Sequence, residues 1–89
     1  MPIWKQIAID DRDAIVEHIA LDNFDAAIKL GALLMEKSMV LDQHPMMGRA
    51  GRVKGTRELV AHPNYILIYR VIDGVAEVLR VKHAAQQYP

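Results

Sequence analysis

The sequence predicts an α+β fold in which an N-terminal strand precedes an α-helical hairpin packed on one face of an antiparallel β-sheet, in the order β-α-α-β-β-β. Three observations support this prediction. Asp73-Gly74 separates the apolar runs YILIYRVI and VAEVLRV, a pattern typical of a tight β-hairpin. His62-Pro63-Asn64 is a second turn signal. Upstream of both turns, two stretches carry apolar residues at helical spacing.

The Asp-Gly turn fixes the register that we expect for the last two strands. A two-residue Asp-Gly loop favours the type I′ geometry, which would place Ile72 opposite Val75 and Arg70 opposite Glu77. We expect the helices to cover the face that carries Ile66, Ile68, Ile72, Val75, Leu79 and Val81. The other face would then be open to solvent or a partner, and it would carry Tyr65, Leu67, Tyr69, Val71, Ala76, Val78, Arg80 and Lys82.

A third strand is expected over residues 56–61, before the His62-Pro63-Asn64 turn. With a short loop, Val60 falls opposite Ile66 on the face predicted to be covered. Leu59 and Arg57 fall on the open face, beside Leu67 and Tyr69.

The N-terminal half predicts a short strand and two helices. Residues 2–7 alternate as a strand does, and Asp10 is suited to cap a helix that begins near Asp11. Leu21-Asp22-Asn23 interrupts the helical pattern, so two antiparallel helices are expected. Their buried stripe would consist of Ile15, Val16, Ile19, Ala20, Phe24, Ala27, Ile28, Gly31, Leu34, Met35 and Leu41. Gly31 favours close approach of the two helices.

Composition narrows the class of protein. Eighty-nine residues predict one domain spanning 1–89, and the formal net charge is zero. The chain has no cysteine, no long apolar run and no secretion signal, so we expect a cytoplasmic protein. The four histidines do not have metal-ligand spacing, and no glycine-rich loop joins a strand to a helix. Neither a metal nor a cofactor is expected.

The residues best suited to chemistry are basic and aromatic ones from the connecting loop and the last strands. They are Arg49, Arg52, Lys54, Arg57, Tyr65, Tyr69, Arg80, Lys82 and His83. Arginine can clamp phosphate, tyrosine can stack a base and histidine can transfer a proton, so this set could bind or cut RNA. The same residue types also suit a protein-binding surface. Composition and spacing favour that interpretation and leave the nuclease as the alternative.

Four short motifs together resemble the RelE/ParE family of toxins from bacterial type II toxin-antitoxin modules. They are Pro45-Met46-Met47-Gly48-Arg49, Gly55-Thr56-Arg57-Glu58-Leu59, the strand Tyr65 to Val71, and Leu79-Arg80-Val81-Lys82-His83 before the terminal Gln86-Gln87-Tyr88-Pro89. The resemblance covers essentially the whole chain. It implies a helical hairpin on an antiparallel sheet, and an antitoxin as partner in a hetero-oligomer.

The resemblance implies two alternative targets. RelE-like members cut messenger RNA on the ribosome, whereas ParE-like members poison DNA gyrase. The two arginines of RelE-like members correspond here to Ile66 and Ala84, while the PxxGR, GTREL and RV-x-H motifs look more like ParE. A ParE-like gyrase inhibitor, which is not itself an enzyme, is therefore the favoured interpretation. An inactive antitoxin-binding homologue is a third.

Each interpretation nominates its own site residues. For a gyrase inhibitor, the resemblance nominates Arg49, Arg57, Tyr69, Arg80 and His83 as target contacts. For a ribosome-dependent ribonuclease, it nominates Arg57, Arg80, His83 and Tyr88 as catalytic residues.

Overall fold

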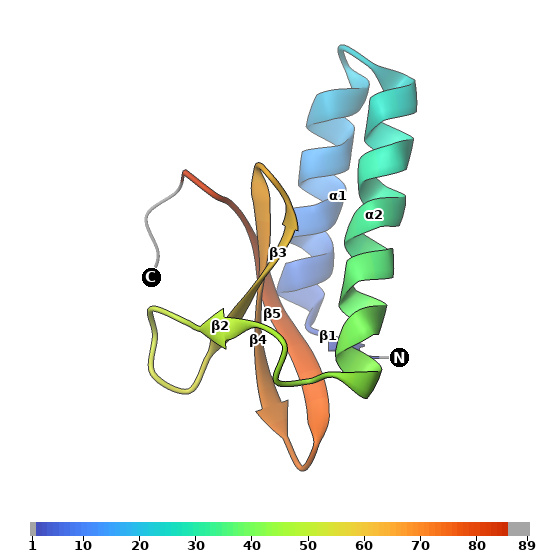
Figure 1. The fold of residues 1–89 in the computed structure, drawn as a ribbon. Coiled ribbons are helices and arrows are strands. Elements are labelled where there is room, and N and C mark those ends of the chain that lie inside the picture. The colour runs from blue at the N-terminus through green and yellow to red at the C-terminus, as the bar shows by residue number, and fades with distance from the viewer. Residues whose placement is uncertain (1, 86–89) are drawn as a thin grey trace.

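A computed structural model describes residues 2–85 of the chain. Its elements are β1 (Ile3–Trp4), α1 (Gln6–Ala20), α2 (Phe24–Gln43), β2 (Arg49–Ala50), β3 (Arg57–His62), β4 (Tyr65–Ile72) and β5 (Val75–His83). The two helices lie side by side on one face of the sheet (Figure 1). The predicted fold class is confirmed. The sheet is nevertheless mixed and not purely antiparallel, because β1 pairs with β5 in parallel. A short strand that was not predicted, β2, also pairs antiparallel with β3.

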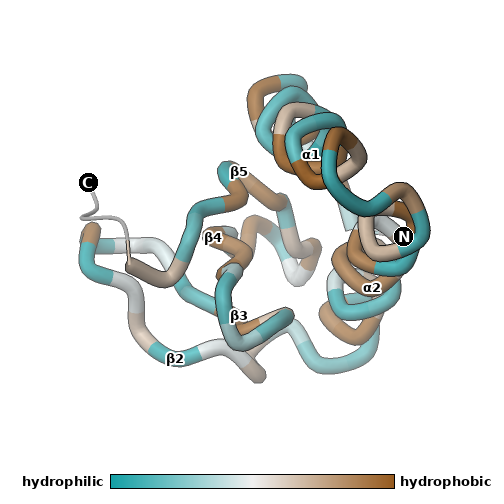
Figure 2. Tube along the Cα trace, turned by 90° about the horizontal axis from the view of Figure 1, so that it is seen from above, coloured by the Kyte–Doolittle hydropathy of each residue, from teal (hydrophilic) through white to brown (hydrophobic). Residues whose placement is uncertain are grey.

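The strand order is β1-β5-β4-β3-β2, so β4 and β5 occupy the centre of the sheet. Figure 2 shows α1 and α2 on one side of β3, β4 and β5, with β2 and its loop on the other side. The main core lies between the helices and the sheet, and it contains Ala8, Leu30, Leu34, Ala61, Leu67, Val78 and Val81. A second buried cluster joins the end of α2 to the sheet through Leu41, Tyr69 and Ala76.

The β4–β5 hairpin has the predicted turn. Asp73 and Gly74 have φ values of 51° and 77°, and a type I′ turn requires positive φ at both positions. Ile72 pairs with Val75 and Arg70 with Glu77, as predicted. The Arg70 Nε also donates a hydrogen bond of 2.6 Å to Glu77 Oε1.

Beyond Tyr69 the predicted register is wrong by one residue. Tyr69 pairs with Val78 but Ile68 pairs with Arg80, which leaves Leu79 as the extra residue of a β-bulge. The predicted pairs of Ile68 with Leu79 and Ile66 with Val81 are therefore not formed. Leu67 pairs with Val81 instead, and Ile66 with Lys82.

The predicted covered face of the sheet is also wrong. The helices pack on the face that carries Tyr65, Leu67 and Tyr69, and both Leu67 and Tyr69 are fully buried. On β3 the predicted pairs of Val60 with Ile66, Leu59 with Leu67 and Arg57 with Tyr69 are confirmed. The faces of the sheet to which these β3 residues point are the reverse of the prediction, because Val60 is exposed while Leu59 packs against the core. Both faces of β4 are apolar, so alternation along this strand does not identify the covered face.

The first helix begins five residues earlier than Asp11, at Gln6, and β1 is only two residues long. The amides of Ala8 and Ile9 already donate to the carbonyl of Lys5, and burial of Ala8 against the sheet favours the early start. In α2 the predicted start is confirmed, because Asn23 accepts a hydrogen bond from the amide of Ala26.

The buried stripe of α2 differs from the prediction. Its buried residues are Ala27, Leu30, Leu34, Ser38 and Leu41, whereas the predicted members Phe24 and Ile28 are 66% and 56% exposed. Gly31 does lie where the helices approach closely. A Cβ at this position would be 3.3 Å from Val16 Cγ2 of α1.

Candidate functional site

The connection from α2 to β3, residues 44–56, is fastened to the sheet by the side chain of Tyr69. The Tyr69 hydroxyl donates to the Pro45 carbonyl at 2.7 Å and accepts from the Gly48 amide at 2.8 Å. Gly48 has no room for a side chain, because a Cβ there would lie 2.7 Å from the Tyr69 ring. Tyr69 is thus buried structural support for this loop, and the expectation that it lies on an open face is wrong.

Arg57 holds the same turn from the neighbouring strand. Its Nη1 donates to the carbonyl of Gly48 at 2.6 Å and to that of Met46 at 3.3 Å. Arg57 of β3 is paired with Tyr69 of β4. The two side chains therefore bind the same turn, residues 45–48, from adjacent strands. The guanidinium of Arg57 is committed to an internal contact.

Glu58 supports the next part of the loop. Its side chain is 3% exposed, and Oε1 receives hydrogen bonds from Arg49 Nη2 at 3.2 Å and Nε at 3.4 Å. The Arg52 amide donates to Oε2 at 3.2 Å. A buried carboxylate requires such partners, because desolvation without them is costly.

A second cluster joins α1 to the edge of β5. β1 pairs with β5 at Glu77 and Val78. Further along β5, the side chain of Asp11 accepts a hydrogen bond from the strand backbone at Val81. Asp11 accepts from Arg80 Nε at 2.8 Å, from Arg80 Nη2 at 3.1 Å and from the Val81 amide at 3.0 Å. The contact ties the first helix to the last strand.

These contacts shift the pKa of Asp11. Burial alone raises the pKa of the carboxyl group, but the hydrogen bonds from Arg80 and Val81 and the charges of Arg80 and Lys82 outweigh it. The net result is a pKa below the ordinary value for aspartate.

His83 lies beside this second cluster, in a shallow hollow of about 320 Å³ lined by Asp11, Tyr65, Arg80 and Lys82 among others. The His83 ring meets the Tyr65 ring edge-on, with 5.3 Å between centroids. Its Nδ1 accepts from the Ala85 amide at 3.0 Å.

The nominated site residues therefore separate into two groups. Arg49, Arg57 and Tyr69 meet at the loop, while Arg80 and His83 meet at the edge of β5; Tyr88 lies outside the described residues. Sequence reasoning missed Asp11 and Glu58, the carboxylates that hold Arg80 and Arg49. An acidic residue amid the apolar and basic residues of β3 was the available signal for Glu58.

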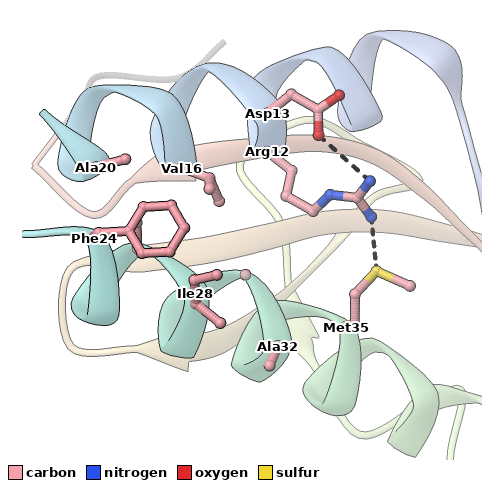
Figure 3. Close-up of a pocket in the computed structure, with 10 residues that line it drawn as sticks. Arg12, Asp13, Val16, Ala20, Phe24, Ile28, Ala32 and Met35 are labelled. Carbon is pink, nitrogen blue, oxygen red and sulfur yellow. Dashed lines mark hydrogen bonds and ion pairs between the residues drawn. The ribbon is translucent and has the colours of Figure 1, made fainter.

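A third feature is an apolar groove between the outer sides of α1 and α2, with a volume of about 440 Å³. Figure 3 shows Val16, Phe24 and Ile28 pointing into it, with Ala20, Ala32 and Met35 alongside. Arg12 closes one end, where it contacts Met35 Sδ at 2.8 Å and lies over the Trp4 ring at 5.2 Å. Part of the stripe that was predicted to be buried lines this groove instead, namely Val16, Ala20, Phe24, Ile28 and Met35. The rest of the prediction is confirmed where Ala27, Leu34 and Leu41 are buried and where Ile15 and Ile19 pack against the core.

Residues 2–85 contain no group of three or more His, Cys, Asp or Glu side chains placed to hold a metal ion. Within the same range, none of the helices has the length and apolar character needed to span a membrane.

Replacing Asp11 by Asn should lower the free energy of unfolding at neutral pH by about 1–2 kcal/mol, because a charged hydrogen-bond acceptor is lost at a partly exposed site. The loss should shrink as the pH falls below about 3.9, where the unfolded wild-type chain takes up the proton that the folded state resists. Urea denaturation between pH 3 and pH 7 measures this, with Asp13→Asn as control, since the Asp13 side chain is 58% exposed. A constant difference across that range would contradict the assignment.

Tyr69→Phe should cost about 1–3 kcal/mol, because the Gly48 amide and the Pro45 carbonyl both lose their partner. Hydrogen exchange of the Gly48 amide should accelerate. Tyr65→Phe in the same strand is the matched control, since its hydroxyl makes no hydrogen bond within residues 2–85. Equal effects of the two substitutions would remove Tyr69 as the anchor of the loop.

Comparison with known proteins agrees with this architecture. Residues 3–88 match the model of the ParE toxin of the type II toxin-antitoxin system parDE. The chain is 41% identical to Y4kP of Sinorhizobium fredii over 97% of its own length and 90% of that protein. It is 32% identical to Toxin RelE2 of Caulobacter vibrioides over 94% of both chains.

Solved structures give the same result. The chromosomal ParDE system from P. aeruginosa superposes with a TM-score of 0.81 at 26% identity, covering 90% of each chain. The conserved hypothetical protein HP0894 of Helicobacter pylori matches at 25% identity with a TM-score of 0.60, over 99% of this chain and 100% of that one. The chain therefore belongs to the ParE family of toxins from type II toxin-antitoxin systems.

Proposed function

We propose that this toxin inhibits DNA gyrase and is neutralised by a cognate antitoxin. The observation that carries the proposal is the internal engagement of the arginines that a ribonuclease would need. Arg57 is held by two loop carbonyls, and Arg80 forms a two-point contact with Asp11. Cleavage of RNA requires cations directed at phosphate and groups placed for proton transfer.

The position of Ile66 supports the same proposal. The resemblance places an arginine of RelE-like toxins here, but Ile66 is 7% exposed and apolar. Under this proposal the toxin acts by binding, with Arg49 and His83 as contacts and Arg57, Tyr69 and Arg80 as supports behind them.

Messenger RNA cleavage on the ribosome is the second candidate, because the Caulobacter relative carries the name Toxin RelE2. In that case Arg57, Arg80, His83 and Tyr88 would be the catalytic candidates. Arg57 and Arg80 would first have to leave their present partners, at the cost of unpairing a partly buried carboxylate at Asp11.

A paired assay on purified toxin separates the two targets. We expect inhibited supercoiling with accumulation of cleaved DNA, and intact messenger RNA on translating ribosomes. Addition of the antitoxin encoded beside the toxin should abolish the inhibition. Ribosome-dependent cuts with normal gyrase activity would overturn the gyrase proposal and favour the ribonuclease.

Membership of the family implies an antitoxin, and we place its contact in the apolar groove between α1 and α2. Leu21, Phe24 and Ile28 are 83%, 66% and 56% exposed. This much exposed apolar surface on an 89-residue chain is typical of a surface that a partner covers. An amphipathic helix or extended segment of the antitoxin would fit such a groove.

Ile28→Glu should therefore weaken antitoxin binding by about tenfold or more, because it places a charge in an apolar contact. Titration calorimetry with purified antitoxin measures the affinity. Lys37→Gln is the control, since it changes the charge by the same amount at an exposed position of α2 outside the groove. Unchanged affinity in Ile28→Glu would exclude the groove as the antitoxin site.

A further inference from the structure

We propose that Met46 and Met47, with the basic side chains that follow them, bind an acidic protein surface that contains an apolar hollow. The proposal deepens the proposed function and rests on it, since the partner would be the target protein of the toxin. Met46 and Met47 are 61% and 55% exposed, although both belong to a turn whose backbone is hydrogen-bonded to Arg57 of the sheet.

The first argument is the way in which the turn is fixed. The Tyr69 hydroxyl and the Arg57 guanidinium together bind the backbone of Pro45, Met46 and Gly48. Fixing the backbone on both sides of two exposed methionines gives them a defined position before any partner arrives. A binding surface ordered in advance loses less conformational entropy on association.

The second argument is charge. The connection, residues 44–56, contains three of the eleven Lys and Arg residues of the chain and no Asp or Glu, although the whole chain has a formal net charge of zero. Arg52 and Lys54 are exposed, and the Arg49 side chain remains 64% exposed while it contacts Glu58. The complementary surface is acidic.

The third argument distinguishes a protein from a nucleic acid. Binding to phosphate requires the basic side chains but gives no use to two exposed methionines. Residues 44–57 also lack Phe, Tyr and Trp, the largest side chains on which unpaired bases stack. Methionine adapts well to apolar hollows on protein surfaces.

The surface is also separate from the antitoxin groove. The groove extends along α2 from Phe24 to Met35, whereas Met46 and Met47 lie beyond the end of α2 at Gln43 and are not among the residues that line the groove. Variants of one surface should therefore leave binding at the other unchanged.

The test is a variant with both Met46→Ser and Met47→Ser, which keeps every charge. Growth arrest on induction, inhibition of gyrase supercoiling and affinity for the antitoxin are measured together. We expect the variant to lose growth arrest, to need at least about tenfold more protein for half-inhibition of gyrase, and to bind antitoxin as the wild type does. Ile72→Ser is the control, because it removes an apolar side chain that is 46% exposed at the end of β4, outside residues 44–57.

A second variant, with Arg52→Gln and Lys54→Gln, examines the charges alone. It should also weaken both growth arrest and the inhibition of gyrase supercoiling. Full activity of the methionine variant overturns the proposal. If the methionine variant is active but the basic variant is not, the partner is a nucleic acid and the proposal is again overturned.

The same measurements on the wild type distinguish failure of the gyrase proposal from failure of the methionine proposal. If the wild type arrests growth without inhibiting gyrase, gyrase is not the target, and loss of growth arrest in the methionine variant still supports a protein contact at the loop. A wild-type chain that neither arrests growth nor inhibits gyrase overturns both proposals.

Discussion

The β-bulge at Leu79 is the constraint on which the packing of the sheet depends. Strict alternation along β5 would place Arg80 and Lys82 on the same face as Ala76 and Val78, against the helices. Burial of two cations there would be costly. The extra residue brings Val81 to that face instead, opposite Leu67, and sets Arg80 opposite Ile68. In the resulting arrangement Arg80 and the Val81 amide both meet Asp11, which joins the two ends of the chain.

Local signals determine much of this fold. The Asp73-Gly74 turn and the break at Leu21-Asp22-Asn23 each depend on residues adjacent in sequence, and both are recognisable there. The covered face of β4 is different, because Ile66 and Ile68 on one side are as apolar as Leu67 and Tyr69 on the other. The bulge in the neighbouring strand favours the face of Leu67, because it places Val81 on that face. The early start of α1 likewise depends on burial of Ala8 against distant strands.

The sequence was sufficient to predict which types of residue form the candidate site. It was much less informative about the role of each residue. Arg57, Tyr69 and Arg80 have the chemistry of a binding surface, but their partners are internal. A sequence does not reveal whether a guanidinium is directed at solvent or at a carboxylate 69 residues earlier. Asp11 and Glu58 were missed for the same reason. What the sequence did indicate is the location, since the PxxGR segment is the loop that these side chains support.

The supports of that loop act almost entirely on its main chain. The hydrogen bonds that Tyr69 and Arg57 make to the loop go to its carbonyl and amide groups, and Glu58 binds the Arg52 amide besides the Arg49 side chain. The shape of the turn is therefore largely independent of which side chains occupy positions 46 and 47. Evolution can exchange these two residues while the scaffold stays intact, so relatives with the same three supports could acquire different recognition preferences without losing stability.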